Sequence, residues 1–171
     1  MAHAVSRVHE SGLPLVYVNM VGGQDELVYD GASFALNADG KLAAHLPSFS
    51  ETTSVIRVGE DFGVPSLTGQ MTPPDDGMGA LYRGLTLGLR DYIDKNGFPG
   101  VVLGLSGGID SAIVAALAVD ALGAERVHAV MMPSPYTSQE SLDDAADLAG
   151  RLGIRLDDIS IAPAMQAMGD M

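Results

Sequence analysis

The residues best suited to bind a phosphate chain are 104–111, with the sequence Gly-Leu-Ser-Gly-Gly-Ile-Asp-Ser. They follow an apolar run at 101–103 and precede an apolar stretch at 112–119 that is typical of a buried helix. A tight glycine turn between a buried strand and a helix start allows several backbone N–H groups to point at one phosphate. Because Gly107 and Gly108 have no Cβ, a polyanion can approach the main chain closely, and a side chain at Gly107 is expected to block it.

Polar side chains in this glycine loop, residues 104–111, extend the prediction to a metal ion. Ser106 and Ser111 add hydroxyl donors, and Asp110 places a carboxylate at the helix start. Since a carboxylate and a phosphate repel each other, we interpret Asp110 as a ligand of Mg²⁺. The loop does not follow the Walker A pattern, because no Gly-Lys-Ser/Thr follows. The alternative is a helix start that needs only glycine and an Asp or Ser cap.

The elements around the loop predict a parallel sheet. Apolar spacing and breakers indicate helices and strands in alternation: a helix at 79–96, a strand at 101–105, a helix at 110–122, a strand at 126–132, a helix at 137–152 and a strand within 155–161. This βαβαβ order implies an α/β fold with parallel strands. The glycine loop then lies at the carboxyl end of its strand, where open α/β sheets bind ligands.

A second segment, residues 131–141, leaves the next strand at the same edge of the sheet. It reads Met-Met-Pro-Ser-Pro-Tyr-Thr-Ser-Gln-Glu-Ser. One interpretation is purely structural: the prolines stop the strand, and Thr137 or Ser138 caps the following helix. The other is that the segment borders a nucleotide base or ribose, because it lies beside the glycine loop.

The first third of the chain has mostly strand signals. We expect a helix at 1–11 and strands at 15–18, 27–29, 33–36, 42–46 and 54–58. Residues 30–32 are interpreted as a hairpin turn between two of these strands, and residues 37–41 as a second turn. Residues 59–78 are rich in glycine, proline and acidic residues, which predicts a linker.

Composition limits the classes of function. The chain has 171 residues, of which 47% are hydrophobic, and its 9 basic and 22 acidic residues give a net charge of −13. Such acidity argues against nucleic acid as a partner. The absence of cysteine excludes disulfides, thiolate metal sites and a cysteine nucleophile within this sequence. No apolar run approaches the roughly 20 residues of a membrane span, so we expect a cytoplasmic protein with no membrane partner.

These motifs together resemble glutamine-dependent NAD⁺ synthetase. The Ser-Gly-Gly-x-Asp-Ser string is similar to the pyrophosphate loop of N-type ATP pyrophosphatases, and Met-Met-Pro-Ser-Pro-Tyr-Thr-Ser follows it about one crossover later. Residues 17–31 resemble the late part of that family's nitrilase-like glutaminase domain. The resemblance implies three parts: residues 1–58 as the C-terminal part of a nitrilase-like α+β layer, residues 59–78 as a linker, and residues 79–171 as the start of a doubly wound parallel sheet like that of the adenine-nucleotide alpha-hydrolases.

The resemblance also implies an activity for the intact enzyme. ATP adenylates the carboxylate of nicotinic acid adenine dinucleotide, and ammonia from glutamine then displaces AMP to give NAD⁺. Family enzymes are commonly large homo-oligomers. The positions matched to the family's ATP site, with Asp110 also on Mg²⁺, are Gly104, Leu105, Ser106, Gly107, Gly108, Ile109, Asp110 and Ser111.

The sequence departs from the family by what it lacks. The family's glutaminase uses a Glu-Lys-Cys triad, and this chain has no cysteine. We therefore expect no catalytic residue in the chain, no glutamine hydrolysis, and binding of ATP·Mg at most. The chain is interpreted as an internal piece of a larger enzyme or a truncated product. The alternatives are a fragment of another ATP pyrophosphatase, such as a GMP synthetase or a tRNA-thiolating enzyme, and a non-catalytic assembly domain.

Other polar residues are weaker candidates. Residues 24–26, Gln-Asp-Glu, could form a polar cluster near a route for ammonia, although a solvated hairpin turn explains them equally. The four histidines lack metal-ligand spacing, and Asp143, Asp144 and Asp147 are expected on a solvated helix face. The nine methionines are expected to fill the core.

Overall fold

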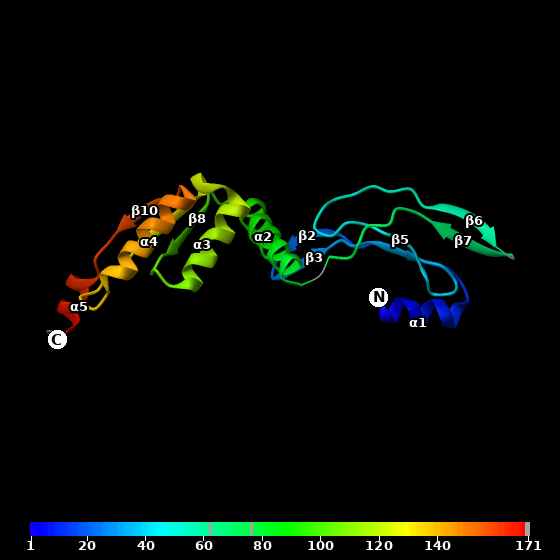
Figure 1. Ribbon diagram of the computed structural model, residues 1–171, viewed down its shortest axis with the longest axis horizontal. Coiled ribbons are helices and arrows are strands. Elements are labelled where there is room, and N and C mark those ends of the chain that lie inside the picture. Colours follow the sequence, from blue (N-terminus) through cyan, green and yellow to red (C-terminus); the bar gives the residue numbers. More distant parts are fainter. Residues whose placement is uncertain (62, 76, 170–171) are drawn as a thin grey trace. The chain divides into compact units, whose positions relative to one another are not determined.

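The structure is a computed structural model that describes residues 1–61, 63–75 and 77–169. Four residues within the expected domain limits therefore lie outside the described residues: 62 and 76 in the predicted linker, and 170 and 171 at the end of the predicted sheet domain. The chain divides into two compact units, Met1–Gly88 and Leu89–Met171. Each unit is described by itself, with its elements labelled in Figure 1.

The first unit is built mainly from short antiparallel strands. It comprises α1 (Ala2–Ser11), β1 (Leu15–Tyr17), β2 (Val21–Gln24), β3 (Leu27–Asp30), β4 (Phe34–Leu36), β5 (Leu42–His45), β6 (Arg57–Asp61) and β7 (Val64–Thr68). One sheet has the order β1-β4-β5, while β2–β3 and β6–β7 form separate two-stranded ribbons. Small side chains on β4 and β5 and Leu67 on β7 form its core cluster.

Local predictions in this unit are largely confirmed. The helix ends where expected, because Gly12 adopts φ 68° and caps α1 in the left-handed conformation. The turn at 37–41 is confirmed as well, with Gly40 at φ 79° and its N–H donating to the Asn37 carbonyl (2.8 Å). The strand predicted at 54–58 is displaced toward the C-terminus and forms β6, so part of the segment predicted as a linker is the β6–β7 ribbon.

The hairpin predicted around residues 30–32 is wrong. Gly31 and Ala32 do adopt positive φ, 70° and 48°, so the chain turns there. However, β3 pairs with β2 and β4 pairs with β1 and β5, so the turn connects two different sheets. The hairpin lies instead between β2 and β3, with Asp25 at φ 52°.

The second unit is the predicted α/β fold. The boundary between the units falls inside α2 (Gly77–Lys95), and the elements that follow are β8 (Val101–Gly104), α3 (Ile109–Leu122), η1 (Ala124–Arg126), β9 (Val127–Met131), α4 (Gln139–Leu152), β10 (Arg155–Asp158) and α5 (Ala162–Gly169). Strands β10, β9 and β8 form one sheet in that order, and both pairs are parallel. The βαβαβ prediction is confirmed, whereas α5 was not predicted.

One face of this sheet forms the main core. Alternate residues of β9 (Val127, Ala129 and Met131) are buried together with Ala115 and Ala118 of α3 and Ala145 and Ala149 of α4. The small side chains let α3 and α4 lie side by side on the strands, as Figure 1 shows. Val102, which points away from this core, is 71% exposed. The parallel order carries β8 and β9 to the same edge, so their carboxyl ends meet.

Arg126 forms hydrogen bonds to the segment that precedes β8. Its guanidinium donates to the carbonyls of Pro99 (3.0 Å) and Phe98 (3.1 Å) and to the Asp94 carboxylate (2.8 Å). We expect Arg126→Met to lower the free energy of unfolding by roughly 1 kcal/mol, because two backbone carbonyls and the Asp94 carboxylate lose a charged donor. Urea denaturation would measure it. Arg151→Met is the control, since Arg151 holds only the exposed Asp147 on its own helix and should change stability by less than about 0.5 kcal/mol. Equal losses in the two variants would contradict the role of Arg126.

Among the helices of the described residues, none combines the length and apolar character needed to cross a membrane.

Candidate functional site

The glycine loop lies where the sequence places it, between the end of β8 and the start of α3. Leu105 continues the sheet contact by donating its N–H to the Val130 carbonyl (3.0 Å), and it is 3% exposed. Gly107 then turns the chain at φ 79°, a conformation that favours glycine. Gly108 is the N-cap of α3, with φ −82° and ψ 155°. The buried Leu105 thus anchors an exposed turn at the sheet edge.

Two serine side chains hold the shape of this turn. The Ser106 hydroxyl accepts a hydrogen bond from the Gly108 N–H (3.3 Å) and lies 3.1 Å from the Ser111 hydroxyl. The Ser111 hydroxyl donates to the Gly108 carbonyl (2.9 Å) and accepts from the Ser106 N–H (3.3 Å). The serines therefore hold the loop in a closed turn through hydrogen bonds within the loop itself.

The start of α3 carries no side-chain cap. Gly108 has no side chain to accept from the first-turn N–H groups, and no cap hydrogen bond is formed. The alternative interpretation, an Asp or Ser cap at this position, is therefore not what the loop does. The N–H groups of the first turn remain available to an external acceptor, and the helix dipole favours an anion there.

The structural interpretation of the second segment is confirmed at Ser138. The Ser138 hydroxyl accepts from the Ser141 N–H (3.2 Å) and so caps α4. Upstream, the Thr137 hydroxyl accepts from the Ser134 N–H (2.9 Å), which fixes the turn at Pro135 and Tyr136. Tyr136 at the tip of this turn is 87% exposed.

The glycine loop and the start of α4 are in backbone contact. A Cβ added to Gly107 would lie 2.3 Å from the Ser141 carbonyl oxygen and 2.8 Å from its Cα. A side chain at Gly107 would therefore push against the backbone of α4, while the expectation that it blocks a phosphate stays a prediction. Gly108 is the open position, since its Cβ would meet only the Ser106 hydroxyl, at 3.4 Å.

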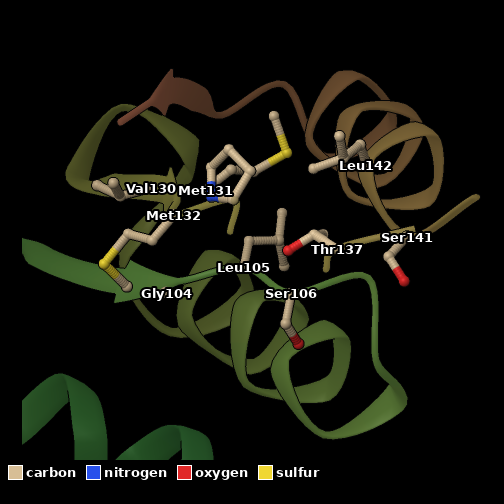
Figure 2. A pocket seen from close by; sticks show the side chains of 10 residues that line it. Gly104, Leu105, Ser106, Val130, Met131, Met132, Thr137, Ser141 and Leu142 are labelled. Atoms are coloured by element: carbon tan, nitrogen blue, oxygen red, sulfur yellow. The ribbon is translucent and has the colours of Figure 1, made fainter. Parts of the chain in front are cut away.

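A pocket of about 310 Å³ joins the two predicted segments. Its lining comes from the ends of β8 and β9, the segment after β9 and the first turn of α4: Gly104, Leu105, Ser106, Val130, Met131, Met132, Pro133, Thr137, Ser141 and Leu142. The side chains of Leu105, Thr137 and Leu142 point toward the same space (Figure 2). The lining combines apolar side chains with three hydroxyl residues, Ser106, Thr137 and Ser141, a mixture that suits a flat base attached to a sugar.

The sequence did not single out two lining residues, Val130 and Leu142. Val130 belongs to the face of β9 that points away from the main core, and Leu142 is an ordinary apolar residue of a helix. No local signal distinguishes either of them from a residue that only packs. Their place in the pocket follows from the pairing of β8 with β9 and from the position of α4.

Asp110 lies in the first turn of α3 and is exposed. Among residues 1–61, 63–75 and 77–169, no group of three or more His, Cys, Asp or Glu side chains could hold a metal ion. This excludes a cage built by the described part of the chain alone. A single hard carboxylate at the start of α3 is compatible with Mg²⁺, which keeps several waters and takes one or two carboxylates together with phosphate oxygens.

The other polar residues considered from the sequence lie in a turn or on a helix surface. Residues 24–26 lie in and beside the β2–β3 turn, as the solvated-turn alternative predicts. Asp143 accepts from Gln139 and Asp147 pairs with Arg151, both on the exposed face of α4. Of the eight methionines in the described residues, only Met131 is buried, so the expectation that methionines fill the core is wrong for the other seven, which are all exposed: Met1, Met20, Met71, Met78, Met132, Met165 and Met168.

Two of the four histidines, His45 and His128, likewise have structural partners. His45 is 4% exposed, and its Nδ1 lies 2.8 Å from the Thr72 carbonyl oxygen. His128 on β9 lies 2.9 Å from the Asp157 carboxylate on β10, and Arg155 donates to the same carboxylate. The Arg155 guanidinium, helped by His128, holds the pKa of the Asp157 carboxyl below its ordinary value of 3.8.

The lowered pKa of Asp157 predicts a small loss of folding stability at acidic pH. Because the pKa is lowered on folding, the stabilisation is present above the ordinary pKa and is lost as the pH falls through the folded-state pKa. We expect Asp157→Asn to be less stable than the natural chain at neutral pH and the difference to disappear as the pH falls from neutral through the lowered pKa of Asp157. Urea denaturation across this range would measure the difference. The control is Asp144→Asn at an exposed position, whose free energy of unfolding should equal that of the natural chain at every pH. If the difference in free energy between Asp157→Asn and the natural chain did not change with pH, the prediction would be wrong.

Comparison with known proteins identifies the family. The NAD synthase family model matches residues 81–171, just over half of the chain. The chain belongs to the NAD synthase family. The match begins within α2 and includes the glycine loop, the pocket and all three parallel strands.

Relatives in the NAD synthase family extend the similarity into the first unit. The chain is 56% identical over 91% of its length to the glutamine-dependent NAD(+) synthetase of Rhodobacter capsulatus, and 44% identical over 96% to that of a Synechocystis strain. It covers 28% and 29% of those two proteins. Among solved structures, the glutamine-dependent NAD+ synthetase of Acinetobacter baumannii, in complex with ADP, matches 96% of the chain with 44% identity and a TM-score of 0.86. The chain covers 31% of that structure, so it spans about a third of the length of its relatives.

Proposed function

We propose that the chain is the nucleotide-binding segment of a glutamine-dependent NAD⁺ synthetase. The observation that carries the proposal is the glycine loop, which presents uncapped N–H groups at the start of α3 directly beside the pocket. The family supports this assignment, and so does the relative from Acinetobacter baumannii, whose structure contains ADP. These findings favour NAD⁺ synthetase over the GMP synthetase and tRNA-thiolating alternatives.

The residues that would bind ATP have distinct roles. The first-turn N–H groups of α3 and the Ser106 hydroxyl would hold the β- and γ-phosphates, because oriented donors at a helix start stabilise an anion that is about to leave. Asp110 would hold Mg²⁺, which when bound neutralises charge on the phosphates. The pocket would hold the nucleoside. The full set proposed for ATP is Gly104, Leu105, Ser106, Gly107, Gly108, Ile109, Asp110 and Ser111.

In the intact protein these contacts would serve an amidation. The carboxylate oxygen of nicotinic acid adenine dinucleotide attacks the α-phosphorus of ATP, and the bond to pyrophosphate breaks. Ammonia derived from glutamine then attacks the adenylated carbon, and AMP leaves with the bonding electrons. The loop contributes by stabilising pyrophosphate as its negative charge develops, which lowers the barrier to the first step.

The remaining features of the enzyme are part of the same proposal. Residues 1–58 would belong to a nitrilase-like glutaminase domain, residues 59–78 to a linker, and residues 79–171 to a doubly wound sheet of which β8, β9 and β10 are one half. The intact protein would be a cytoplasmic homo-oligomer that uses glutamine and nicotinic acid adenine dinucleotide. The relatives named glutamine-dependent NAD(+) synthetase support the first unit's assignment, because the similarity covers 91% of the chain.

Titration calorimetry of the purified chain tests the proposal. We expect ATP to bind in the presence of Mg²⁺, and AMP to bind more weakly because it lacks the phosphates that the loop would hold. A folded chain that binds neither nucleotide would overturn the proposal for this chain and would leave a non-catalytic assembly domain as its role.

The chain should release no glutamate from glutamine. It has no cysteine, and the family's glutaminase chemistry needs a cysteine thiolate as nucleophile. A coupled glutamate assay on the purified chain, with a bacterial glutaminase as the positive control, would measure this. Glutamate release that grows in proportion to the amount of chain would contradict the proposed division of roles.

A further inference from the structure

We infer that Ser138 is a positioning residue for the glycine loop, acting through the backbone of Ser141. This inference rests on the proposed function, because the loop is taken to bind the phosphates of ATP. Ser138 is absent from the residues that line the pocket, and its hydroxyl is occupied by the cap of α4. It would therefore influence a ligand without touching it.

The glycine loop packs directly on the backbone of α4. The Cβ that Gly107 lacks would fall 2.3 Å from the Ser141 carbonyl oxygen, 2.8 Å from its Cα and 2.9 Å from its carbonyl carbon. All three are backbone atoms, so this is main chain packed on main chain without a flexible side chain between them. A shift of the Ser141 backbone would consequently either open a void beside Gly107 or force the loop to move.

Hydrogen bonds with Ser138 hold the Ser141 backbone in place. The Ser138 hydroxyl accepts from the Ser141 N–H (3.2 Å) and lies 2.9 Å from the Ser141 hydroxyl, while the Ser138 carbonyl accepts from the Leu142 N–H (3.3 Å). Of these bonds, two depend on the Ser138 side chain. Without its hydroxyl the first turn of α4 loses its side-chain cap and frays.

The contact between the glycine loop and α4 lies beside the pocket. Ser106 from the loop and Ser141 from α4 both line the pocket (Figure 2). The separation of the loop from α4 therefore sets the width of the site, and Gly107 lies where the two meet. A frayed α4 would leave the donors of α3 intact but would no longer fix their position relative to the nucleoside pocket. ATP would contact both the donors of α3 and the pocket, so its affinity should fall the most.

The test combines calorimetry with amide NMR signals of Gly107 and Gly108. We expect Ser138→Ala to weaken Mg·ATP binding about fivefold, on the order of the effect of a lost helix N-cap, and to shift both amide signals. Ser138→Thr keeps a capping hydroxyl and should restore both. Ser138→Gly removes the hydroxyl but retains a residue tolerated at N-caps, so it gives the same readouts if the alanine variant fails to fold.

The matched control lies at the other end of the same helix. Gly153 caps the C-terminus of α4 at φ 67°, and Gly153→Ala should destabilise the helix without a steric clash, since nothing lies within 4 Å of the added Cβ. We expect this variant to leave ATP affinity and the two amide signals unchanged. Equal losses in Gly153→Ala and Ser138→Ala, or no change in Ser138→Ala, would overturn the inference.

The outcome separates the two proposals. If the natural chain binds no ATP, the proposed function fails while the inference is still decided by the amide signals. A shift at Gly107 and Gly108 in Ser138→Ala, restored in Ser138→Thr and absent in Gly153→Ala, would support the positioning role without any ligand. Unchanged amide signals in Ser138→Ala would overturn it.

Discussion

Gly107→Ala is expected to lower the free energy of unfolding of the second unit by roughly 2–5 kcal/mol. The backbone at Gly107 has φ 79°, where a non-glycine residue costs about 1–2 kcal/mol. The new methyl group would also meet the Ser141 carbonyl oxygen at 2.3 Å, so α4 must shift, and overpacking of this kind costs about 1–3 kcal/mol. Urea denaturation followed by circular dichroism would measure the loss, which is a large part of a typical domain stability.

Gly108→Ala is the matched control, one residue further along. Gly108 has φ −82° and ψ 155°, which any residue adopts, and its Cβ would meet only the Ser106 hydroxyl at 3.4 Å. The weaker N-cap and the smaller entropy of the unfolded chain act in opposite directions, so stability should change by less than about 1 kcal/mol. ATP binding should nevertheless weaken, because the methyl group would stand at the open face of the loop. If Gly107→Ala is as stable as Gly108→Ala, the loop does not pack on α4 as described.

Asp110→Asn should abolish the dependence of ATP binding on Mg²⁺. We expect the natural chain to bind ATP about tenfold more tightly with Mg²⁺ than with EDTA, because the carboxylate would hold the ion against the phosphates. In Asp110→Asn the two affinities should become equal, at a level no lower than that of the natural chain in EDTA, since repulsion between Asp110 and the phosphates is also removed. Calorimetry in the two buffers measures both affinities.

Asp147→Asn is the control for net charge. It removes the same unit of charge from the second unit, at a position exposed on α4 and paired only with Arg151. This variant should retain the full effect of Mg²⁺. If the natural chain binds ATP equally well with and without Mg²⁺, Asp110 does not hold the metal ion. If Asp147→Asn also loses the effect of Mg²⁺ on ATP affinity, the effect is one of net charge.

The order of elements in the second unit could be predicted because its signals are local. Glycine ends α4 at Gly153, and apolar residues at helical spacing identify α2 before Gly97. The alternation of strands and helices then left a parallel sheet as the only arrangement consistent with short connections. The glycine loop at the end of β8 followed from the same order.

Strand partners in the first unit could not be predicted in the same way. Asp30-Gly31 is a strong turn signal, and Gly31 does adopt φ 70°, yet β3 pairs with β2 across a turn that contains Asp25 and no glycine. Strands of three to five residues carry too little pattern to choose among several possible neighbours. The same uncertainty explains the displaced strand β6.

By itself the sequence determined the order of helices and parallel strands from α2 to β10 and the loop that could hold a phosphate chain, because each depends on residues near one another along the chain. The tertiary structure alone decided that Gly107 packs on Ser141 and that Val130 and Leu142 share one pocket with Ser106. These contacts join residues up to 36 positions apart, and no local preference encodes which backbone will lie against which. The physical reason is that packing between elements is set by the shapes of several elements at once, whereas helix starts, ends and turns are set by a few neighbouring residues.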